Sequence, residues 1–258
     1  MSDRLLAKGV MAAAVVCGLG GIGLLVAFPG GWPLVRFHWP LAGALCWDAF
    51  LSLLFFLQHS GMVRRGFRAR LAIVIPPRYH GAVYSIASGV ALAVVVLFWQ
   101  PSDMPLLILN GLSRGLAQTC AILAIVIFVW GASALRGFDP FGLGPIRAYL
   151  HGQEQGPPPF VVRGPYRWVR HPLYFAILLL IWVSPDVTAD RLLFNILWTA
   201  WIYVGARLEE KDLVRGFGDS YERYRRKVPI LIPWRGRVKL RRRHSVPRGS
   251  LAEQLAAV

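Results

Sequence analysis

The chain has 258 residues, of which 55% are hydrophobic and only 16% are charged, and its formal net charge is +16. This apolar content excludes an intrinsically disordered chain. A nucleic-acid binder is disfavoured as well, since basic proteins of that class seldom combine so little polar surface with such long apolar runs. A membrane protein explains both values, because anionic headgroups attract Lys and Arg while lipid accepts the apolar remainder.

Four apolar runs are long enough, or nearly so, to cross a hydrocarbon core of about 30 Å, which needs roughly 17 to 25 helical residues. They cover 9–28, 41–57, 81–99 and 116–135. Arg4 and Lys8 precede the first run, as in a signal peptide, but the residues around Pro29 do not form a small-residue cleavage site. We therefore expect the first run to be a helix of the mature protein.

Two shorter apolar segments follow at 173–183 and 192–206, and Pro185 and Asp186 between them indicate a turn. The first segment would reach only about 17 Å as a helix. It spans a membrane only if the helix begins near Trp168, which would bring Arg170 and His171 into its first turns. The expected fold is thus an all-α, polytopic membrane bundle of five or six transmembrane helices.

Loop charges predict the orientation of this bundle. Arginines are concentrated between the second and third runs and after the fourth, whereas the intervening loops contain only Arg36 and Arg114. By the positive-inside rule, the arginine-rich loops and both termini are cytoplasmic. Beyond 206, apolar residues recur at three- and four-residue spacing among Lys and Arg, which predicts an interfacial helix, broken at Gly216 or Gly218.

The chain is expected to have three regions. Residues 1–135 form an N-terminal region of four transmembrane helices, and residues 136–234 form a catalytic region with a cytoplasmic cap. Residues 235–258 form a basic, flexible tail that binds anionic headgroups of membrane lipids. The proline-rich stretch 152–165 could be a lid or a connector, and a connector is the expected reading.

Two polar features could carry chemistry. The segment 163–174 combines Arg, His and Tyr beside an apolar segment, and Glu209 and Glu210 are adjacent acids in a chain with 13 acidic and 29 basic residues. Paired acids facing Arg and His suit a ligand that is both cationic and hydroxylated. S-adenosylmethionine fits, because its sulfonium and ammonium need anions or ring faces and its carboxylate needs Arg or His.

These motifs carry a resemblance. Gly164 to Tyr174 reads GPYRWVRHPLY, and Glu209 to Pro233 reads EEKDLVRGFGDSYERYRRKVPILIP. Together they resemble the C-terminal catalytic half of the integral-membrane methyltransferases related to isoprenylcysteine carboxyl methyltransferase and the phospholipid methyltransferases. Gln58-His59-Ser60, the segment 138–143 (FDPFGL) and the RHPLY block further resemble the methanethiol S-methyltransferase branch, which makes dimethyl sulfide.

The resemblance implies roles for individual residues. It implies a cofactor site for S-adenosylmethionine made of Tyr166, Arg167, Arg170, His171, Tyr174, Glu209, Glu210, Tyr221, Tyr224 and Arg225. Gln58, His59 and Asp139 would face the methyl acceptor. His59, Asp139, Arg170 and Tyr174 would act in catalysis, and no metal is implied.

The expected reaction is in-line transfer of a methyl group to a small thiolate, which gains from a dry, aligned site more than from acid catalysis. A small thiol would be the partner, and the protein would lie in a bacterial inner membrane with a cytoplasmic active face. The alternative acceptors are a prenylcysteine carboxylate or a phospholipid amine. Haem ligation by His59 and His80 and a non-catalytic membrane protein are the alternatives outside this class.

Asp48, inside the second apolar run, is either a functional residue or a partner for an interior Trp, for Asn195 or for a backbone group. Cys17, Cys46 and Cys120 are expected to be small core residues.

Overall fold

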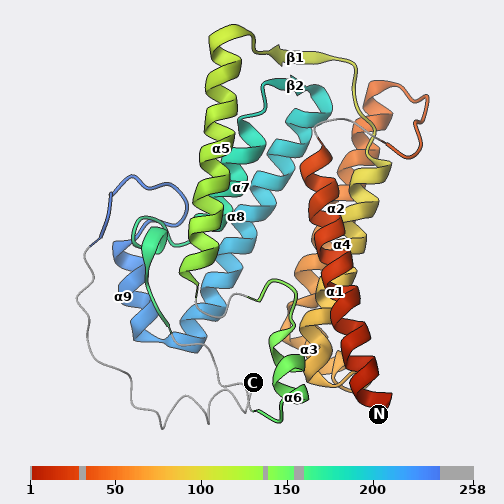
Figure 1. Cartoon of the computed structure of the whole chain (residues 1–258). Helices are drawn as coiled ribbons and strands as arrows, with labels where there is room; N and C mark the ends of the chain where they lie inside the picture. The colour runs from red at the N-terminus through yellow and green to blue at the C-terminus, as the bar shows by residue number, and fades with distance from the viewer. Residues whose placement is uncertain (1, 29–32, 136–138, 154–159, 239–258) are drawn as a thin grey trace. The chain divides into compact units, whose positions relative to one another are not determined.

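The computed structural model describes residues 2–28, 33–135, 139–153 and 160–238. In chain order its elements are α1 (Ser2–Ala27), α2 (Leu41–Met62), α3 (Arg65–Leu71), the 3-10 turn η2 (Pro77–Tyr79), α4 (His80–Phe98), β1 (Pro105–Ile108), α5 (Gly111–Ala134), α6 (Gly144–Leu150), the 3-10 turn η3 (Gly164–Arg167), α7 (Pro172–Trp182), β2 (Asp186–Thr188), α8 (Ala189–Phe217) and α9 (Asp219–Lys227) (Figure 1). Most of the predicted basic tail, part of the 152–165 connector and Phe138 lie outside the described residues.

Four stretches of described helix are long and apolar enough to cross a membrane: Asp3–Ala27, Leu41–Met62, Pro77–Phe98 and Gly111–Ala134. They overlap the four predicted runs, so a mainly helical chain with four candidate membrane helices is confirmed, while a fifth and a sixth span stay a prediction. The next apolar helix, α7, has only 11 residues, which is about 17 Å at the α-helical rise. The second short segment, 192–206, lies inside the 29-residue α8.

The predicted turn around Pro185 leads into a short strand that the sequence does not reveal. β2 pairs with β1 in a two-stranded sheet, so the described chain is not purely helical. The backbone N–H of Ala189 also donates to the carbonyl of Met104. Strands of three and four residues carry no readable periodicity, which is why the sequence predicts only a turn here.

The chain divides into two compact units, each built from several segments. Unit 1 contains Met1–Leu107, Asp139–Gly156 and Asp186–Trp198. Unit 2 contains Ile108–Phe138, Pro157–Pro185 and Thr199–Val258. The expected functional regions 1–135, 136–234 and 235–258 stay a prediction.

In unit 1, α4 packs against both α1 and α2 (Figure 1). Glycines let the backbones of α1 and α4 meet, because a Cβ on Gly21 would lie 2.7 Å from the carbonyl oxygen of Gly89, and a Cβ on Gly89 would collide with the carbonyl of Cys17. Close approach of small residues is a common basis of helix association in membranes, where apolar burial alone gives little preference for protein over lipid.

Two buried acids in unit 1, one on α2 and one at the start of α8, bind the segment that follows α4. Asp48 accepts the backbone N–H of Gln100 at 2.8 Å, and Asp190 accepts the indole N–H of Trp99 and the backbone N–H of Ser102, both at 3.0 Å. Both acids are fully buried. Asp48 therefore has a backbone partner, as the sequence analysis predicts for the alternative to a functional role.

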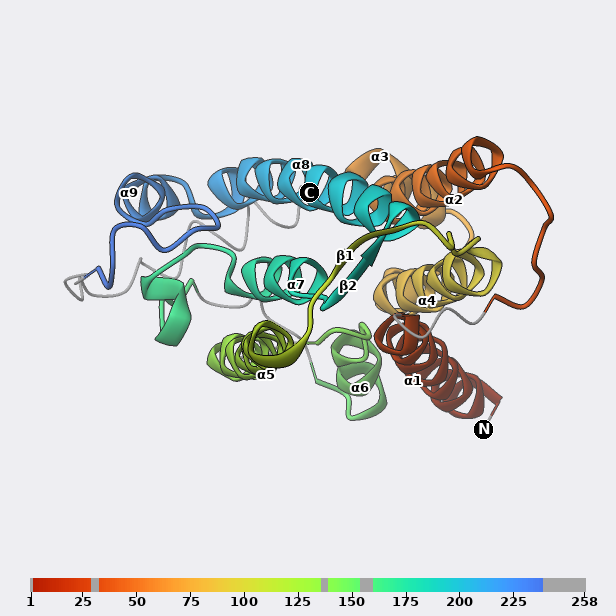
Figure 2. The ribbon, with the colours of Figure 1, turned by 90° about the horizontal axis from the view of Figure 1, so that it is seen from above.

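Unit 2 contains α5, α7 and the 199–217 part of α8, with α7 between the other two (Figure 2). Gly131 of α5 faces α7, since a Cβ there would lie 2.9 Å from Leu173. Gly164 adopts a positive φ of +48° and lies against Trp130 of α5, so the start of the RHPLY region is fixed to that helix.

The helix start near Trp168, which a membrane span by the segment 173–183 would need, is not found, and Arg170 and His171 do not lie in the first turns of a helix. His171 is the N-cap of α7, with φ −123° and ψ 68°, and Pro172 is the first helical residue. The proline ring disfavours helical backbone in the residue before it, while its own fixed φ suits a helix start. Arg167 ends η3 and Arg170 lies between the two helical segments, so neither side chain belongs to a face of α7.

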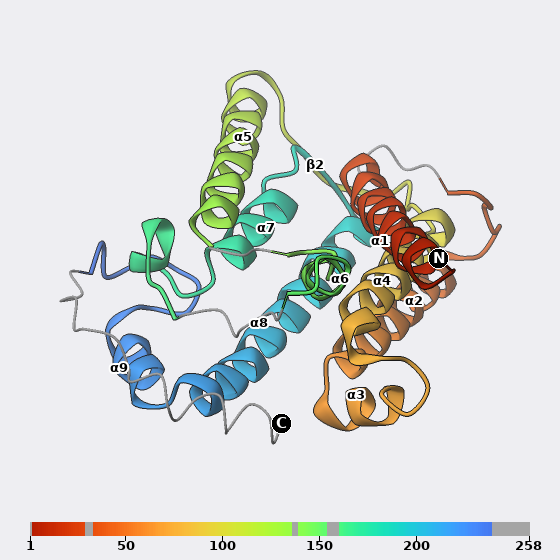
Figure 3. The ribbon, with the colours of Figure 1, turned by 60° about the horizontal axis from the view of Figure 1, so that its bottom comes forward.

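The predicted break at Gly216 or Gly218 is confirmed at Gly218. This residue has φ +50°, which favours glycine, and α9 begins immediately after it. Figure 3 shows α9 leaving the end of α8 in a new direction. Tyr221, Tyr224 and Val228 of this segment are buried, with Phe160 and Phe217 packed against them.

The glycine contact between α1 and α4 gives a stability prediction. Gly89→Ala should lower the free energy of unfolding by about 1 to 3 kcal/mol, because the new methyl group overpacks the helix interface. Gly20→Ala is the matched control: a Cβ there meets nothing within 4 Å, and alanine favours the helix. Unfolding in detergent, followed by circular dichroism, measures both, and equal stability of the two variants would contradict the proposed contact.

Candidate functional site

The two sequence motifs of unit 2 are joined through their backbones. The N–H of Arg170 donates to the carbonyl of Pro229 at 2.9 Å, and the N–H of His171 donates to the carbonyl of Ile230 at 3.1 Å. These bonds link the RHPLY block to the VPILIP segment that follows α9. Residues about sixty positions apart in sequence thus form one local structure.

Arg170 connects the start of α7 to both α8 and α9. Its Nε donates to Oε1 of Glu210 at 2.5 Å, and its Nη1 donates to the carbonyls of Arg225 at 2.6 Å and Val228 at 2.5 Å. Those carbonyls belong to the last turn of α9 and the residue after it, where a helix lacks internal donors and its dipole attracts a cation. The Arg170 side chain is only 8% exposed.

The two adjacent acids have different surroundings. The Glu210 side chain is 3% exposed, whereas that of Glu209 is 45% exposed. Consecutive helical residues point about 100° apart, which explains this separation. Oε2 of Glu209 accepts the hydroxyl of Tyr174 at 2.8 Å, and Oε1 of Glu210 lies 3.5 Å from the hydroxyl of Tyr221.

His171 lies between these carboxylates. Its Nδ1 is 3.7 Å from Oε2 of Glu209, and its Nε2 is 3.4 Å from Oε1 of Glu210, a contact that lacks the alignment of a hydrogen bond. The ring stacks parallel to that of Tyr174, with centroids 5.2 Å apart and an interplanar angle of 4°. Two aromatic faces and an exposed carboxylate, that of Glu209, thus adjoin one another.

Burial and ion contacts act in opposite directions on Glu210. Burial by itself would raise the pKa of this carboxyl, but the contacts with His171 and Arg170 outweigh it and hold the pKa below the ordinary value of 4.5. Glu210 is therefore ionised at neutral pH. Burial also raises the pKa of the Tyr221 and Tyr224 phenols, so both remain protonated donors.

The remaining predicted cofactor residues contribute mainly through backbone groups. The carbonyl of Tyr166 accepts the hydroxyl of Tyr224 at 2.7 Å, and the carbonyl of Arg167 accepts the N–H of Val238 at 2.9 Å. The guanidinium of Arg225 donates to Glu222 on the exposed side of α9. The sequence gives no indication of Phe160, whose ring contacts Phe217, Tyr221 and Tyr224 from a segment without regular structure.

A second polar cluster lies in unit 1, between α2 and α4. Nδ1 of His59 is 3.1 Å from the hydroxyl of Ser88, and its Nε2 is 2.6 Å from the hydroxyl of Tyr84. The amide of Gln58 donates to Sδ of Met62 at 2.9 Å and lies 3.5 Å from Ser88. Tyr84 and Ser88 are absent from the predicted site, although their four-residue spacing in an apolar run places them on one helix face.

The histidines of the haem alternative have other partners. Both ring nitrogens of His59 contact hydroxyls, and Nε2 of His80 donates to the carbonyl of Ile75 at 2.9 Å. This hydrogen bond favours a structural role for His80 over a role as a haem ligand.

Asp139 lies in unit 1, where its carboxylate binds the start of α6. Its two oxygens accept the backbone N–H groups of Leu143 at 2.9 Å and Gly144 at 2.5 Å. Free N–H groups at a helix start attract a carboxylate. This contact is therefore sufficient to explain why an aspartate stands at position 139. The role of Asp139 toward a methyl acceptor stays a prediction.

Comparison with known proteins decides the family. The sequence profile described as NnrU protein matches residues 49–212. The chain belongs to this family. It is also similar to a methanethiol S-methyltransferase from a Pseudomonas species, with 36% identity over 78% of this chain and 77% of the relative. Methanethiol S-methyltransferase 1 of Bradyrhizobium diazoefficiens is 34% identical over 75% of this chain and 68% of the relative.

A methanethiol S-methyltransferase of Crocosphaera subtropica is 36% identical over 76% of this chain and 78% of the relative. No solved structure matches the chain. The resemblance to integral-membrane methyltransferases that the sequence motifs predict is thus confirmed. The matched profile contains both acids, Glu209 and Glu210, and ends before α9.

The burial of Glu210 predicts a pH-dependent stability difference. Because its folded pKa is lowered, the ionised carboxylate stabilises the fold above pH 4.5, and this contribution is lost as pH falls through the folded pKa. Glu210→Gln should cost about 3 kcal/mol at pH 7, since it leaves Arg170 buried without its anion. The difference between the two proteins should shrink below pH 4.5 in thermal unfolding scans.

Asp212→Asn is the control for that measurement, because Asp212 pairs with Arg215 on the exposed side of α8. An exposed ion pair of this kind contributes little to the free energy of unfolding. If Asp212→Asn and Glu210→Gln were equally stable at pH 7, Glu210 would not hold the three segments together.

Proposed function

We propose that the chain is an integral-membrane methyltransferase that transfers a methyl group from S-adenosylmethionine to the sulfur of a small thiol. Methanethiol is the acceptor in the names of the relatives above. The observation that carries the proposal is the half-exposed Glu209 carboxylate beside the stacked rings of His171 and Tyr174. The proposed setting is a bacterial inner membrane with a cytoplasmic active face.

The residues of this cluster fit the chemistry of that cofactor. When bound, S-adenosylmethionine supplies an electrophilic methyl group on a sulfonium. Glu209 offers a carboxylate to a positive centre or a ribose hydroxyl, and the faces of His171 and Tyr174 suit a cation. In this proposal Glu209, His171 and Tyr174 contact the cofactor. Arg170, Glu210, Tyr221 and Tyr224 hold them in position, with Tyr166, Arg167 and Arg225 beside them.

The second cluster suits the acceptor. Methyl transfer needs a thiolate, since the thiol is a poor nucleophile and its pKa is about 8.5 or higher. His59 has hydroxyl partners at both nitrogens, and neutral imidazole carries one donor and one acceptor. We propose that His59 takes the thiol proton, directly or through Tyr84. The thiolate then forms the new C–S bond as the methyl–sulfonium bond breaks, with Gln58 and Asp139 as further acceptor-side residues.

Glu209→Gln should weaken S-adenosylmethionine binding about tenfold, the effect expected when one charge-assisted interaction is lost. Isothermal titration of the detergent-purified chain measures the affinity, and headspace detection of dimethyl sulfide from methanethiol measures turnover. Asp212→Asn, on the exposed side of the same helix, is the matched control. An unchanged affinity in Glu209→Gln would overturn the cofactor assignment.

The same experiment distinguishes the acceptors. Cofactor binding without dimethyl sulfide would direct the search to a prenylcysteine carboxylate or a phospholipid amine. A chain that binds no cofactor, and whose purified form has a Soret band, would support haem binding instead.

Tyr84→Phe should move the alkaline rise of kcat/KM for methanethiol toward higher pH and lower its value near pH 7 by about tenfold or more, because His59 loses a hydroxyl partner. Tyr203→Phe is the control, since Tyr203 is 48% exposed on α8. The pH profile separates a role in proton transfer from a purely structural one, which would lower the rate equally at every pH.

A further inference from the structure

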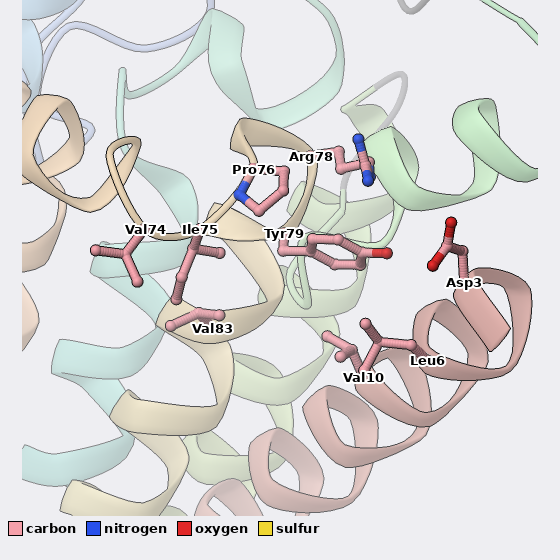
Figure 4. Close-up of a pocket in the computed structure, with 9 residues that line it drawn as sticks. All are labelled: Asp3, Leu6, Val10, Val74, Ile75, Pro76, Arg78, Tyr79 and Val83. Atoms are coloured by element: carbon pink, nitrogen blue, oxygen red, sulfur yellow. The ribbon is translucent and has the colours of Figure 1, made fainter.

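A pocket of about 350 Å³ opens in unit 1 between the start of α1 and the segment that leads from α3 into α4 (Figure 4). Leu6 and Val10 of α1 line one side, and Ile75 and Val83 line the other. Val74 also lines it, and Val74 and its neighbour Ile73 are 80% and 84% exposed. In a membrane protein such an apolar pocket at the end of transmembrane helices suits an acyl chain better than a polar ligand.

The pocket also contains a cation that lacks an anion. The guanidinium of Arg78 lies 4.2 Å from the ring centroid of Tyr149 and 5.0 Å from that of Tyr79. Its Nε is buried and has no hydrogen-bond partner among the described residues, and no described carboxylate pairs with it. A half-buried guanidinium held by ring faces keeps its donors available for a planar or tetrahedral oxyanion.

A single acid completes the pocket. Asp3, in the first turn of α1, lines the same space as Arg78. Figure 4 shows the hydroxyl of Tyr79 directed toward Asp3, with Arg78 nearby. One positive group, one negative group and a phenol in an apolar pocket complement a ligand with a phosphate, an ammonium and a hydrocarbon tail.

We propose that this pocket binds an aminophospholipid, a zwitterionic lipid whose headgroup has a phosphate diester and a primary ammonium. Arg78 and the Tyr79 hydroxyl hold the phosphate, Asp3 holds the ammonium, and one acyl chain follows Leu6, Val10 and Val83. An anionic lipid without an ammonium fits less well, because Asp3 would repel it. None of these residues belongs to the proposed methyl-transfer clusters, so the inference does not depend on that function.

Native mass spectrometry of the full chain in detergent tests the proposal with three probes: phosphatidylethanolamine, phosphatidylglycerol and phosphatidylcholine with identical acyl chains. We expect the ethanolamine lipid to be retained at least several-fold more than either other lipid. Arg78→Gln should lower retention of that lipid about tenfold. Asp3→Asn should lower it as well, while leaving phosphatidylglycerol unchanged or better retained.

Arg68→Gln is the matched control, because Arg68 is exposed on α3 and does not line the pocket. Equal retention of the ethanolamine and glycerol lipids, unaffected by Asp3→Asn, would overturn the zwitterionic assignment. If Arg68→Gln and Arg78→Gln lowered retention of the ethanolamine lipid equally, the binding would be a general attraction between a basic surface and lipid. That result would overturn the proposed binding in the pocket. Asp3→Asn keeps the test valid if Arg78→Gln fails to fold.

Discussion

The geometry of unit 2 depends on one guanidinium. Arg170 joins the chain before α7, the carboxylate of Glu210 on α8 and the carbonyls at the end of α9. A cation so little exposed is costly unless it is paired and fully hydrogen-bonded. The three segments must therefore come together at this point or leave a charge buried without partners. His171 and Tyr174, directly after Arg170, take their positions beside Glu209 as a result.

The two adjacent acids, Glu209 and Glu210, have different roles in this arrangement. Glu210 faces inward and neutralises Arg170, while Glu209 faces outward with nearly half of its side chain exposed. Without the inner pair, the outer carboxylate would have no fixed position relative to the rings of His171 and Tyr174. Precise binding generally requires buried supporting residues that fix the position of the accessible side chain that contacts the ligand.

Buried polar groups elsewhere in the chain also have partners on neighbouring segments. In lipid an unpaired polar group costs several kcal/mol, which favours at least one partner for each buried acid or imidazole. Asp48 finds the N–H of Gln100, Asp190 finds Trp99, and His59 finds Ser88 and Tyr84. Asp48 and Asp190 stabilise the fold. In the proposed reaction, His59 and Tyr84 are the pair that would handle the thiol proton.

The sequence by itself determined the four long helices, the break at Gly218 and the association of the RHPLY block with the adjacent acids, because the length of an apolar run, a glycine and a motif can each be read directly from the chain. Tertiary structure alone decided that β1 pairs with β2. It also decided that Glu210 is buried while Glu209 is exposed. Adjacent identical residues carry identical local signals, and only the partner that approaches each one, here Arg170 or Tyr174, distinguishes them.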